Sequence, residues 1–111
     1  MALKELLEID DLQEVYAASE EKPVLLFKQS TTCPISASAF RAYQQFLEQT
    51  DENAYFVKVR ETRPVSNQIE TDLGVQHQSP QIFIVKNKEV VWNASHYDIT
   101  VNNIAKALEE A

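Results

Sequence analysis

The single cysteine of the chain has the neighbours of a reactive thiol. Cys33 follows Thr32 and precedes Pro34, Ile35 and Ser36. Proline is accepted in the first turn of a helix because its φ is already helical and its missing N–H is not needed there. The segment therefore predicts that a strand ends here and that a helix begins just after Cys33. Unpaired N–H groups and the helix dipole favour a thiolate at such a position, and the thiolate is the nucleophile of thiol–disulfide exchange, so we predict that Cys33 is catalytic.

The position three residues after the cysteine holds a serine, Ser36. Its hydroxyl or backbone N–H can hydrogen-bond the sulfur, but a serine cannot attack a disulfide. A mixed disulfide formed on Cys33 would therefore wait for a thiol from outside the chain. The competing interpretation is that Cys33 is a small buried hydrophobe. The junction, Pro34 and the pair Ser79-Pro80 favour the reactive role.

One of the two histidines, His77, is a candidate for tuning this thiol. His77 lies three residues before Pro80, and an imidazolium there would stabilise a thiolate further. The alternative is a loop histidine bonded to backbone. His96 is expected to be structural. The spacing of the histidines and Cys33 matches no zinc pattern, so no metal site is predicted.

Other residues are candidates for binding a substrate. Thr32 and Ile35 flank the sulfur and are predicted to line a substrate groove. Arg60 and Arg63 can attract a carboxylate of an acidic small thiol, although a solvated face is the simpler interpretation of both.

The hydrophobic pattern predicts the elements that position Cys33. A helix is expected over residues 10–21, because Asp10 and Gln13 have the spacing of a capping box and Pro23 ends it. Residues 24–27 form a continuous apolar run, which is typical of a strand covered on both faces. The later elements are a helix from Pro34 with a stripe of Phe40, Tyr43, Phe46 and Leu47, a strand from near Ala54, a helix from Pro64 to Gly74, a hairpin of residues 82–85 and 90–92 around Asn87-Lys88, and a helix capped by Thr100.

This order predicts an α/β fold in one domain, residues 1–111. A parallel strand–helix–strand unit comes first and an antiparallel hairpin follows. Right-handed crossovers and a tight turn join such strands into a mixed four-stranded sheet with helices on both faces.

The composition excludes several classes of function. The formal net charge is -7, and the basic residues form no long run, so we expect no nucleic-acid partner. Acidic residues interrupt the leucines of the first ten positions, so no signal peptide is expected, and no apolar run has the length of a membrane span. A lone cysteine without an export signal suits the reducing cytoplasm, where we expect the protein to act.

Several separated blocks of the sequence resemble one family, the YtxJ-type monothiol bacilliredoxins. The block from Thr32 to Ser36, Cys-Pro-Ile-Ser included, is the most specific of them. The blocks, in chain order, are Lys28-Gln29-Ser30-Thr31-Thr32-Cys33-Pro34-Ile35-Ser36, Arg63-Pro64-Val65-Ser66-Asn67, Gly74-Val75-Gln76-His77-Gln78-Ser79-Pro80-Gln81-Ile82-Phe83, and Trp92 with Ser95-His96.

The resemblance implies a thioredoxin-like fold and removal of bacillithiol from mixed disulfides on client proteins. In that scheme the bacillithiol is transferred to Cys33. Free bacillithiol, a co-substrate, then regenerates Cys33. A flavoprotein bacillithiol-disulfide reductase supports this cycle indirectly. No tightly bound cofactor is implied. The resemblance also implies that the Ser79-Pro80 bond is cis and lies beside the sulfur, where the backbone of Ser79 can pair with a bound substrate.

Two other functions remain open from the sequence. Two chains can each offer Cys33 to a shared iron–sulfur cluster, as some monothiol glutaredoxins do, although the Cys-Gly-Phe-Ser motif of those proteins is absent. The chain can also be a stress-associated protein whose fold only recognises partners.

Overall fold

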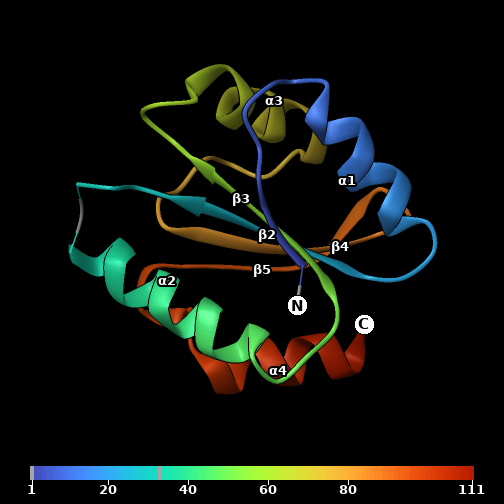
Figure 1. The fold of residues 1–111 in the computed structure, drawn as a ribbon, viewed down its shortest axis with the longest axis vertical. Helices are drawn as coiled ribbons and strands as arrows, with labels where there is room; N and C mark the ends of the chain where they lie inside the picture. Colours follow the sequence, from blue (N-terminus) through green and yellow to red (C-terminus); the bar gives the residue numbers. More distant parts are fainter. Residues whose placement is uncertain (1, 33) are drawn as a thin grey trace.

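The computed structural model describes residues 2–32 and 34–111. Two helices, α1 and α3, cover one face of a central sheet, and α2 and α4 cover the other (Figure 1). The elements are β1 (Ala2–Glu5), α1 (Asp11–Ser19), β2 (Val24–Gln29), α2 (Pro34–Leu47), β3 (Asn53–Lys58), α3 (Arg63–Leu73), β4 (Gln81–Lys86), β5 (Glu89–Ser95), a short 3-10 turn η1 (His96–Asp98) and α4 (Val101–Glu110).

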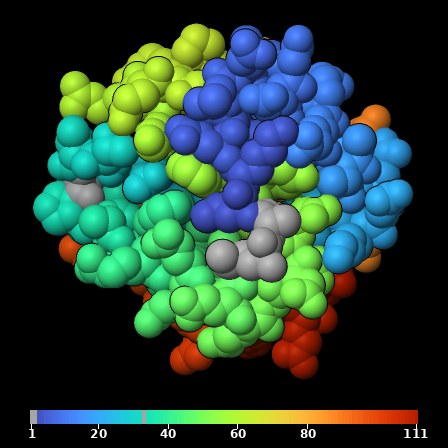
Figure 2. Space-filling view, in the orientation of Figure 1, coloured from blue at the N-terminus to red at the C-terminus, as the bar shows by residue number. Residues whose placement is uncertain are grey.

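The sheet has five strands in the order β1-β3-β2-β4-β5, so the expected count of four is wrong by one edge strand. β1 runs parallel to β3. Leu6, just after β1, is fully buried, and its N–H donates to the carbonyl of Phe56 at 2.8 Å. In the space-filling view this N-terminal segment crosses the centre of the face, between the α3 and α2 regions (Figure 2). The mixed α/β sheet with helices on both faces is as predicted.

The start of α1 differs from the expected capping box. Asp10 makes no side-chain bond to the helix. Instead, Oδ2 of Asp11 accepts the backbone N–H groups of Leu7 and Glu8, at 2.9 and 3.0 Å. These two bonds lower the pKa of the Asp11 carboxyl. The carboxylate therefore fixes the turn that leads from β1 into the helix.

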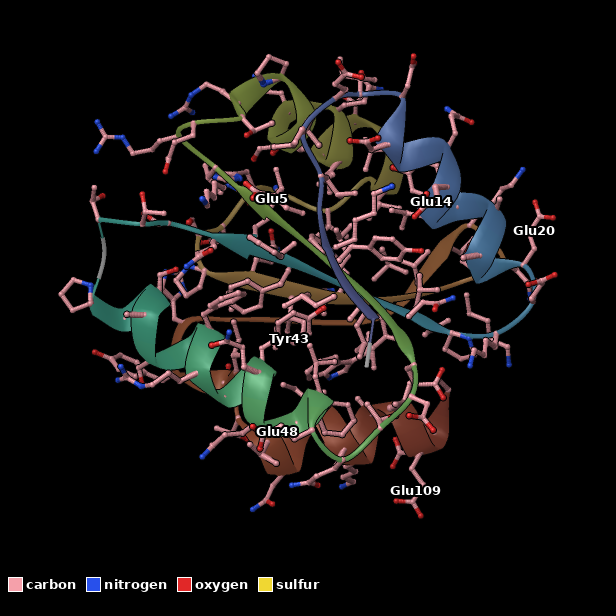
Figure 3. The ribbon with its side chains drawn as sticks, viewed as in Figure 1. Glu5, Glu14, Glu20, Tyr43, Glu48 and Glu109 are labelled. Atoms are coloured by element: carbon pink, nitrogen blue, oxygen red, sulfur yellow. The ribbon has the colours of Figure 1, made fainter. Side chains whose placement is uncertain are left out.

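Aromatic side chains join β2 to α2, the two elements on either side of position 33. The ring of Phe27 stacks on that of Tyr43 with centroids 5.0 Å apart, and Phe40 lies 5.3 Å from Phe27. Tyr43 is fully buried and points from α2 toward the sheet, where its hydroxyl donates to the carbonyl of Tyr55 at 3.0 Å (Figure 3). The predicted aromatic stripe is thus the face that fixes α2 on the sheet.

Three predicted boundary signals are confirmed, although α1 ends two residues earlier than expected, α3 begins one residue earlier, and both hairpin strands are longer than 82–85 and 90–92. Gly74 ends α3 with φ 68°, in the left-handed region that glycine adopts without strain. Asn87 and Lys88 both have positive φ, which suits a tight hairpin turn. Oγ1 of Thr100 caps α4 by accepting the N–H of Asn103 at 3.1 Å. Within residues 2–32 and 34–111, no helix has the length and apolar character needed to cross a membrane.

Candidate functional site

Three loops meet at one end of the sheet. Gln29 at the end of β2 pairs with Lys58 at the end of β3, and Lys28 pairs with Gln81 at the start of β4. β2 is parallel to β3 and antiparallel to β4. The residues after β2, those after β3 and those before β4 therefore leave the sheet together. Residues 30–32, 59–62 and 76–80 are the three loops.

The first loop leads into α2. Cys33, the predicted catalytic residue, lies outside the described residues. Thr32 is exposed, Pro34 is the exposed first residue of α2, and Ile35 is half-buried. The helix therefore begins at the proline, as the sequence predicts.

Ser36 is fully buried. Its Oγ accepts the backbone N–H of Ser30 at 2.8 Å, and this bond ties the first turn of α2 to the chain leaving β2. The serine was predicted to contact the sulfur or a substrate. In the structure its side chain has no exposed surface, which contradicts a direct contact with a substrate, and the expected contact with the sulfur lies outside the described residues.

The second loop adds a cation beside Thr32. Nη1 of Arg60 lies 3.5 Å from Oγ1 of Thr32, and Oγ1 of Thr31 donates to Oε2 of Glu61 at 2.9 Å. The four residues line an open groove of about 340 Å³. Arg60 is exposed, as the favoured interpretation of a solvated face expects, and it also borders the groove next to Thr32.

The third loop carries the proline. The Ser79-Pro80 bond is cis, as the resemblance implied, with Pro80 buried and Ser79 half-buried. The carbonyl of Pro80 accepts the N–H of His96 at 3.2 Å, which agrees with the structural role expected of His96. The buried side chain of Gln81 accepts from the N–H of Gln78 at 3.1 Å and donates to a carbonyl of the same loop. The loop is therefore held firmly against the sheet.

His77 belongs to this loop and is half-buried. Its backbone N–H donates to Oε2 of Glu70 at 2.7 Å, and its Nδ1 lies 2.9 Å from Nζ of Lys28. Burial, followed by the Lys28 charge, lowers the pKa of His77, while Glu70 opposes the shift. A lowered pKa disfavours the imidazolium, which was one of the two interpretations that the sequence left open for His77.

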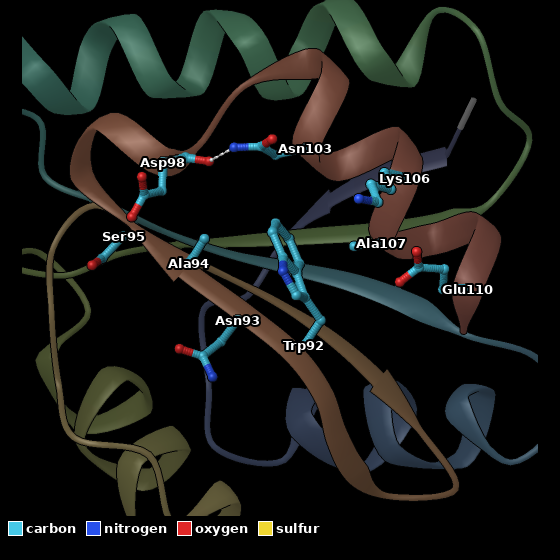
Figure 4. Close-up of a pocket in the computed structure, with 9 residues that line it drawn as sticks. All are labelled: Trp92, Asn93, Ala94, Ser95, Asp98, Asn103, Lys106, Ala107 and Glu110. Carbon is cyan, nitrogen blue, oxygen red and sulfur yellow. Dashed lines mark hydrogen bonds between the residues drawn. The ribbon is translucent and has the colours of Figure 1, made fainter.

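A larger cleft of about 520 Å³ lies between β5 and α4 (Figure 4). Trp92, Lys106 and Glu110 line it, and at one end Nδ2 of Asn103 donates to the carbonyl of Asp98 at 2.9 Å. Among the described residues that line it, none is a predicted site residue. Trp92 also packs on the core, as predicted. Size alone therefore does not mark this cleft as the chemical site.

Sequence reasoning missed the residues that support the loops: the buried Lys28 and Gln81, the half-buried Ser30 and the exposed Glu70. Lys28 left a signal, because it follows Leu26 at strand spacing and so falls on the same buried face of β2. Within residues 2–32 and 34–111, no group of three or more His, Asp or Glu side chains is arranged to hold a metal ion.

The fold and the three loops define a thioredoxin-fold protein. A solved structure described as having a thioredoxin fold is 38% identical, with a TM-score of 0.86 over 96% of this chain and 93% of that chain. The reduced thioredoxin pre-protein of Schistosoma mansoni, at 16% identity, has a TM-score of 0.80 over 99% of this chain and 98% of its own. Thioredoxin f from spinach chloroplast, at 17% identity, has a TM-score of 0.75 over 98% and 85%. The last two comparisons concern the fold alone.

A family model narrows the class further. The model described as monothiol bacilliredoxin BrxC matches residues 4–104. The match spans nearly the whole chain and includes all three loops. The chain belongs to the monothiol bacilliredoxin family.

Proposed function

We propose that the protein is a single-cysteine thiol–disulfide oxidoreductase that removes bacillithiol from mixed disulfides on protein cysteines through Cys33. The observation that carries the proposal is the family match over residues 4–104, which includes the only cysteine of the chain. The loop before Cys33, the helix after it and the cis-proline loop meet at one end of the sheet. This arrangement supports placing the chemistry there.

The reaction has two exchange steps. The Cys33 thiolate attacks the bacillithiol sulfur of a client's mixed disulfide, so that a new S–S bond forms on Cys33 and the client leaves as a thiolate. A second bacillithiol thiolate then attacks the disulfide on Cys33, which restores the Cys33 thiolate and forms bacillithiol disulfide. A flavoprotein reductase returns that disulfide to two thiols. The protein itself needs no tightly bound cofactor, and the cytoplasm is the proposed compartment.

Ser36 supports the requirement for an outside thiol. The position that could hold a resolving cysteine holds a serine whose oxygen already accepts a backbone N–H. The substrate-binding role is assigned to Thr32, Pro34, Ile35, His77, Ser79 and Pro80, which border position 33 or form the cis-proline loop. Ser36 contributes indirectly, because its oxygen accepts the backbone N–H of Ser30 in the loop before Cys33.

Arg60 supports an acidic co-substrate. Its guanidinium borders the groove next to Thr32, and a guanidinium binds a carboxylate with two parallel hydrogen bonds. Glu61 lies in the same groove, but Thr31 already donates to its carboxylate. Among the described residues that line this groove, Arg60 is the cation available to a small acidic thiol.

The test is the recovery of a client's thiol. A bacillithiolated client protein is incubated with the wild-type chain or with Cys33→Ala, and its free thiol is measured over time. We expect release with the wild type and none above background with Cys33→Ala. Release that is equal with both proteins would refute the proposal, and client binding that survives Cys33→Ala without release would favour a non-catalytic partner. A coloured protein after anaerobic purification would instead favour the cluster-bridging function.

A further inference from the structure

A groove of about 730 Å³ lies between the loop that follows β1 and the start of α3. Its apolar lining consists of Leu7, Ile9, Pro64 and Val65. The two segments lie side by side at the top of the space-filling view, where blue atoms meet yellow-green ones (Figure 2). None of these four side chains belongs to the three loops of the candidate site.

The loop after β1 presents large apolar side chains at the surface. Leu7 is 63% exposed and Ile9 is 43% exposed. The loop is fixed, because Oδ2 of Asp11 accepts the backbone N–H groups of Leu7 and Glu8. A contiguous apolar patch around a hollow is typical of an interaction surface, and a preformed one loses little conformational entropy when a partner covers it.

The rim of this groove is acidic. Glu8, Asp10 and Glu61 line it, and no lysine or arginine does so among the described residues. Arg63 precedes Pro64 and is exposed, but it does not line the groove. None of the salt bridges formed within residues 2–32 and 34–111 includes the three carboxylates. The groove therefore complements an apolar side chain that has a basic residue beside it.

The groove is continuous with the candidate site. Glu61 also lines the smaller groove that contains Thr32 and Arg60. Since β1 runs parallel to β3, the loop after β1 leaves the sheet at the same end as the loop after β3. A polypeptide that lies beside Thr32 can therefore extend into the acidic-rimmed groove.

We propose that this groove docks the segment of a client protein that flanks its modified cysteine, by binding one large apolar side chain and an adjacent lysine or arginine. The inference rests on the proposed function, because it specifies the clients of the same site. A second copy of the chain fits less well, since a symmetric contact would place the acidic rims of two copies against each other. An anionic membrane surface would be repelled for the same reason.

The first test measures binding without exchange chemistry. A short peptide with serine in place of the modified cysteine, followed by leucine and lysine, is added to the ¹⁵N-labelled wild-type chain, and amide chemical shifts are recorded by NMR. We expect the changes to concentrate in residues 7–10 and 61–65, and to be absent with a peptide in which serine and glutamate replace the leucine and lysine. Changes confined to other segments, or equal changes with both peptides, would overturn the proposal.

Variants then test the lining and the rim. Leu7→Ser and Ile9→Ser should each weaken binding of the leucine–lysine peptide about 4- to 15-fold, the effect of losing one or two buried CH₂ groups. Glu8→Gln combined with Asp10→Asn should weaken it about 2- to 5-fold and reduce its dependence on salt. Val91→Ser is the matched control, because Val91 is 49% exposed on β5, and it should leave binding unchanged. Equal losses in Ile9→Ser and Val91→Ser would overturn the proposal.

Transfer kinetics connect the groove to the reaction. Ile9→Ser should raise the KM for the bacillithiolated leucine–lysine peptide about 4- to 15-fold, and leave unchanged the KM for the mixed disulfide of bacillithiol with free cysteine, which has no flanking residues. An equal rise for both substrates would overturn the proposal. A failed proposed function is distinguishable, because transfer is then absent with every substrate while the NMR changes with the serine peptide persist.

Other occupants give different results. Sedimentation analysis of the wild type should show a monomer. A dimer that Leu7→Ser dissociates would assign the groove to a second copy, and binding to phosphatidylcholine vesicles that Leu7→Ser abolishes would assign it to a lipid surface. Either result would overturn the proposal.

Discussion

Replacing Ser36 with alanine tests how the loop before position 33 is held. Ser36→Ala removes the Oγ that accepts the N–H of Ser30 at 2.8 Å. Leaving a buried donor without a partner costs about 1–3 kcal/mol. Because Ser30 is only half-buried, water replaces part of the lost bond, and we expect the lower part of this range, about 1–2 kcal/mol.

Helix propensity acts in the opposite direction and needs a control. Alanine is a better helix former than serine by about 0.5 kcal/mol, which hides part of the loss. Ser38 lies in the same helix and is exposed. Ser38→Ala therefore measures the propensity gain without the hydrogen bond.

The assay is urea unfolding of the wild type and both variants. The difference in unfolding free energy between Ser38→Ala and Ser36→Ala should be about 1–2 kcal/mol, with Ser36→Ala the less stable. This corresponds to a fall in melting temperature of about 4 °C for each kcal/mol. A difference close to zero would refute the assignment of Ser36 as the support of this loop.

Three further predictions concern the ends of helices and the charges of the site. Gly74→Ala should cost about 1 kcal/mol in urea unfolding, because φ is 68° there and no atom lies within 4 Å of an added Cβ; unchanged stability would contradict the strain. Arg60→Gln should raise the KM for bacillithiol about 2- to 5-fold, the worth of an exposed charge pair, while the KM for an uncharged thiol and the kinetics of Arg41→Gln stay unchanged; equal effects on both thiols would remove Arg60 as a carboxylate site. Burial lowers the pKa of Lys28 from 10.5 to about 8, so between these values the unfolded chain binds a proton that the folded chain lacks and stability rises with pH. The unfolding free energy of the wild type minus that of Lys28→Met should therefore increase over this window, and a flat or falling difference would contradict the burial of the charge.

Local signals were sufficient for most of the fold. The apolar run of β2, the stripe of α2, Gly74 at the end of α3 and Thr100 at the start of α4 each act within a few residues. β1 was not predicted, because it is only four residues long, has acidic and basic side chains, and is defined by parallel pairing with β3, some fifty residues away. An edge strand of four residues is too short to show a periodic pattern in the sequence.

The candidate site was less predictable, because it also depends on contacts between segments that are distant in the sequence. The proline loop and the segment around position 33 were recognised from their residues. The solvated face favoured for Arg60 agrees with its exposure, and the structure adds that Arg60 borders a groove next to Thr32. The contact of the Lys28 side chain with His77, and that of the Ser30 N–H with the Ser36 side chain, depend on the three-dimensional fold and not on a local pattern. The sequence left the role of His77 open, because its charge depends on burial in the fold and then on the Lys28 charge from another strand, both of which lower its pKa.

The most direct test of the account is the mass of the chain itself. The protein is incubated with a bacillithiolated client in the absence of free thiol, and intact-mass analysis follows, with Cys33→Ala as the control. The account predicts one bacillithiol per wild-type chain, located on Cys33, with an equal amount of client thiol released and no adduct on Cys33→Ala. A wild-type chain that stays unmodified, or an adduct on the variant as well, would contradict it.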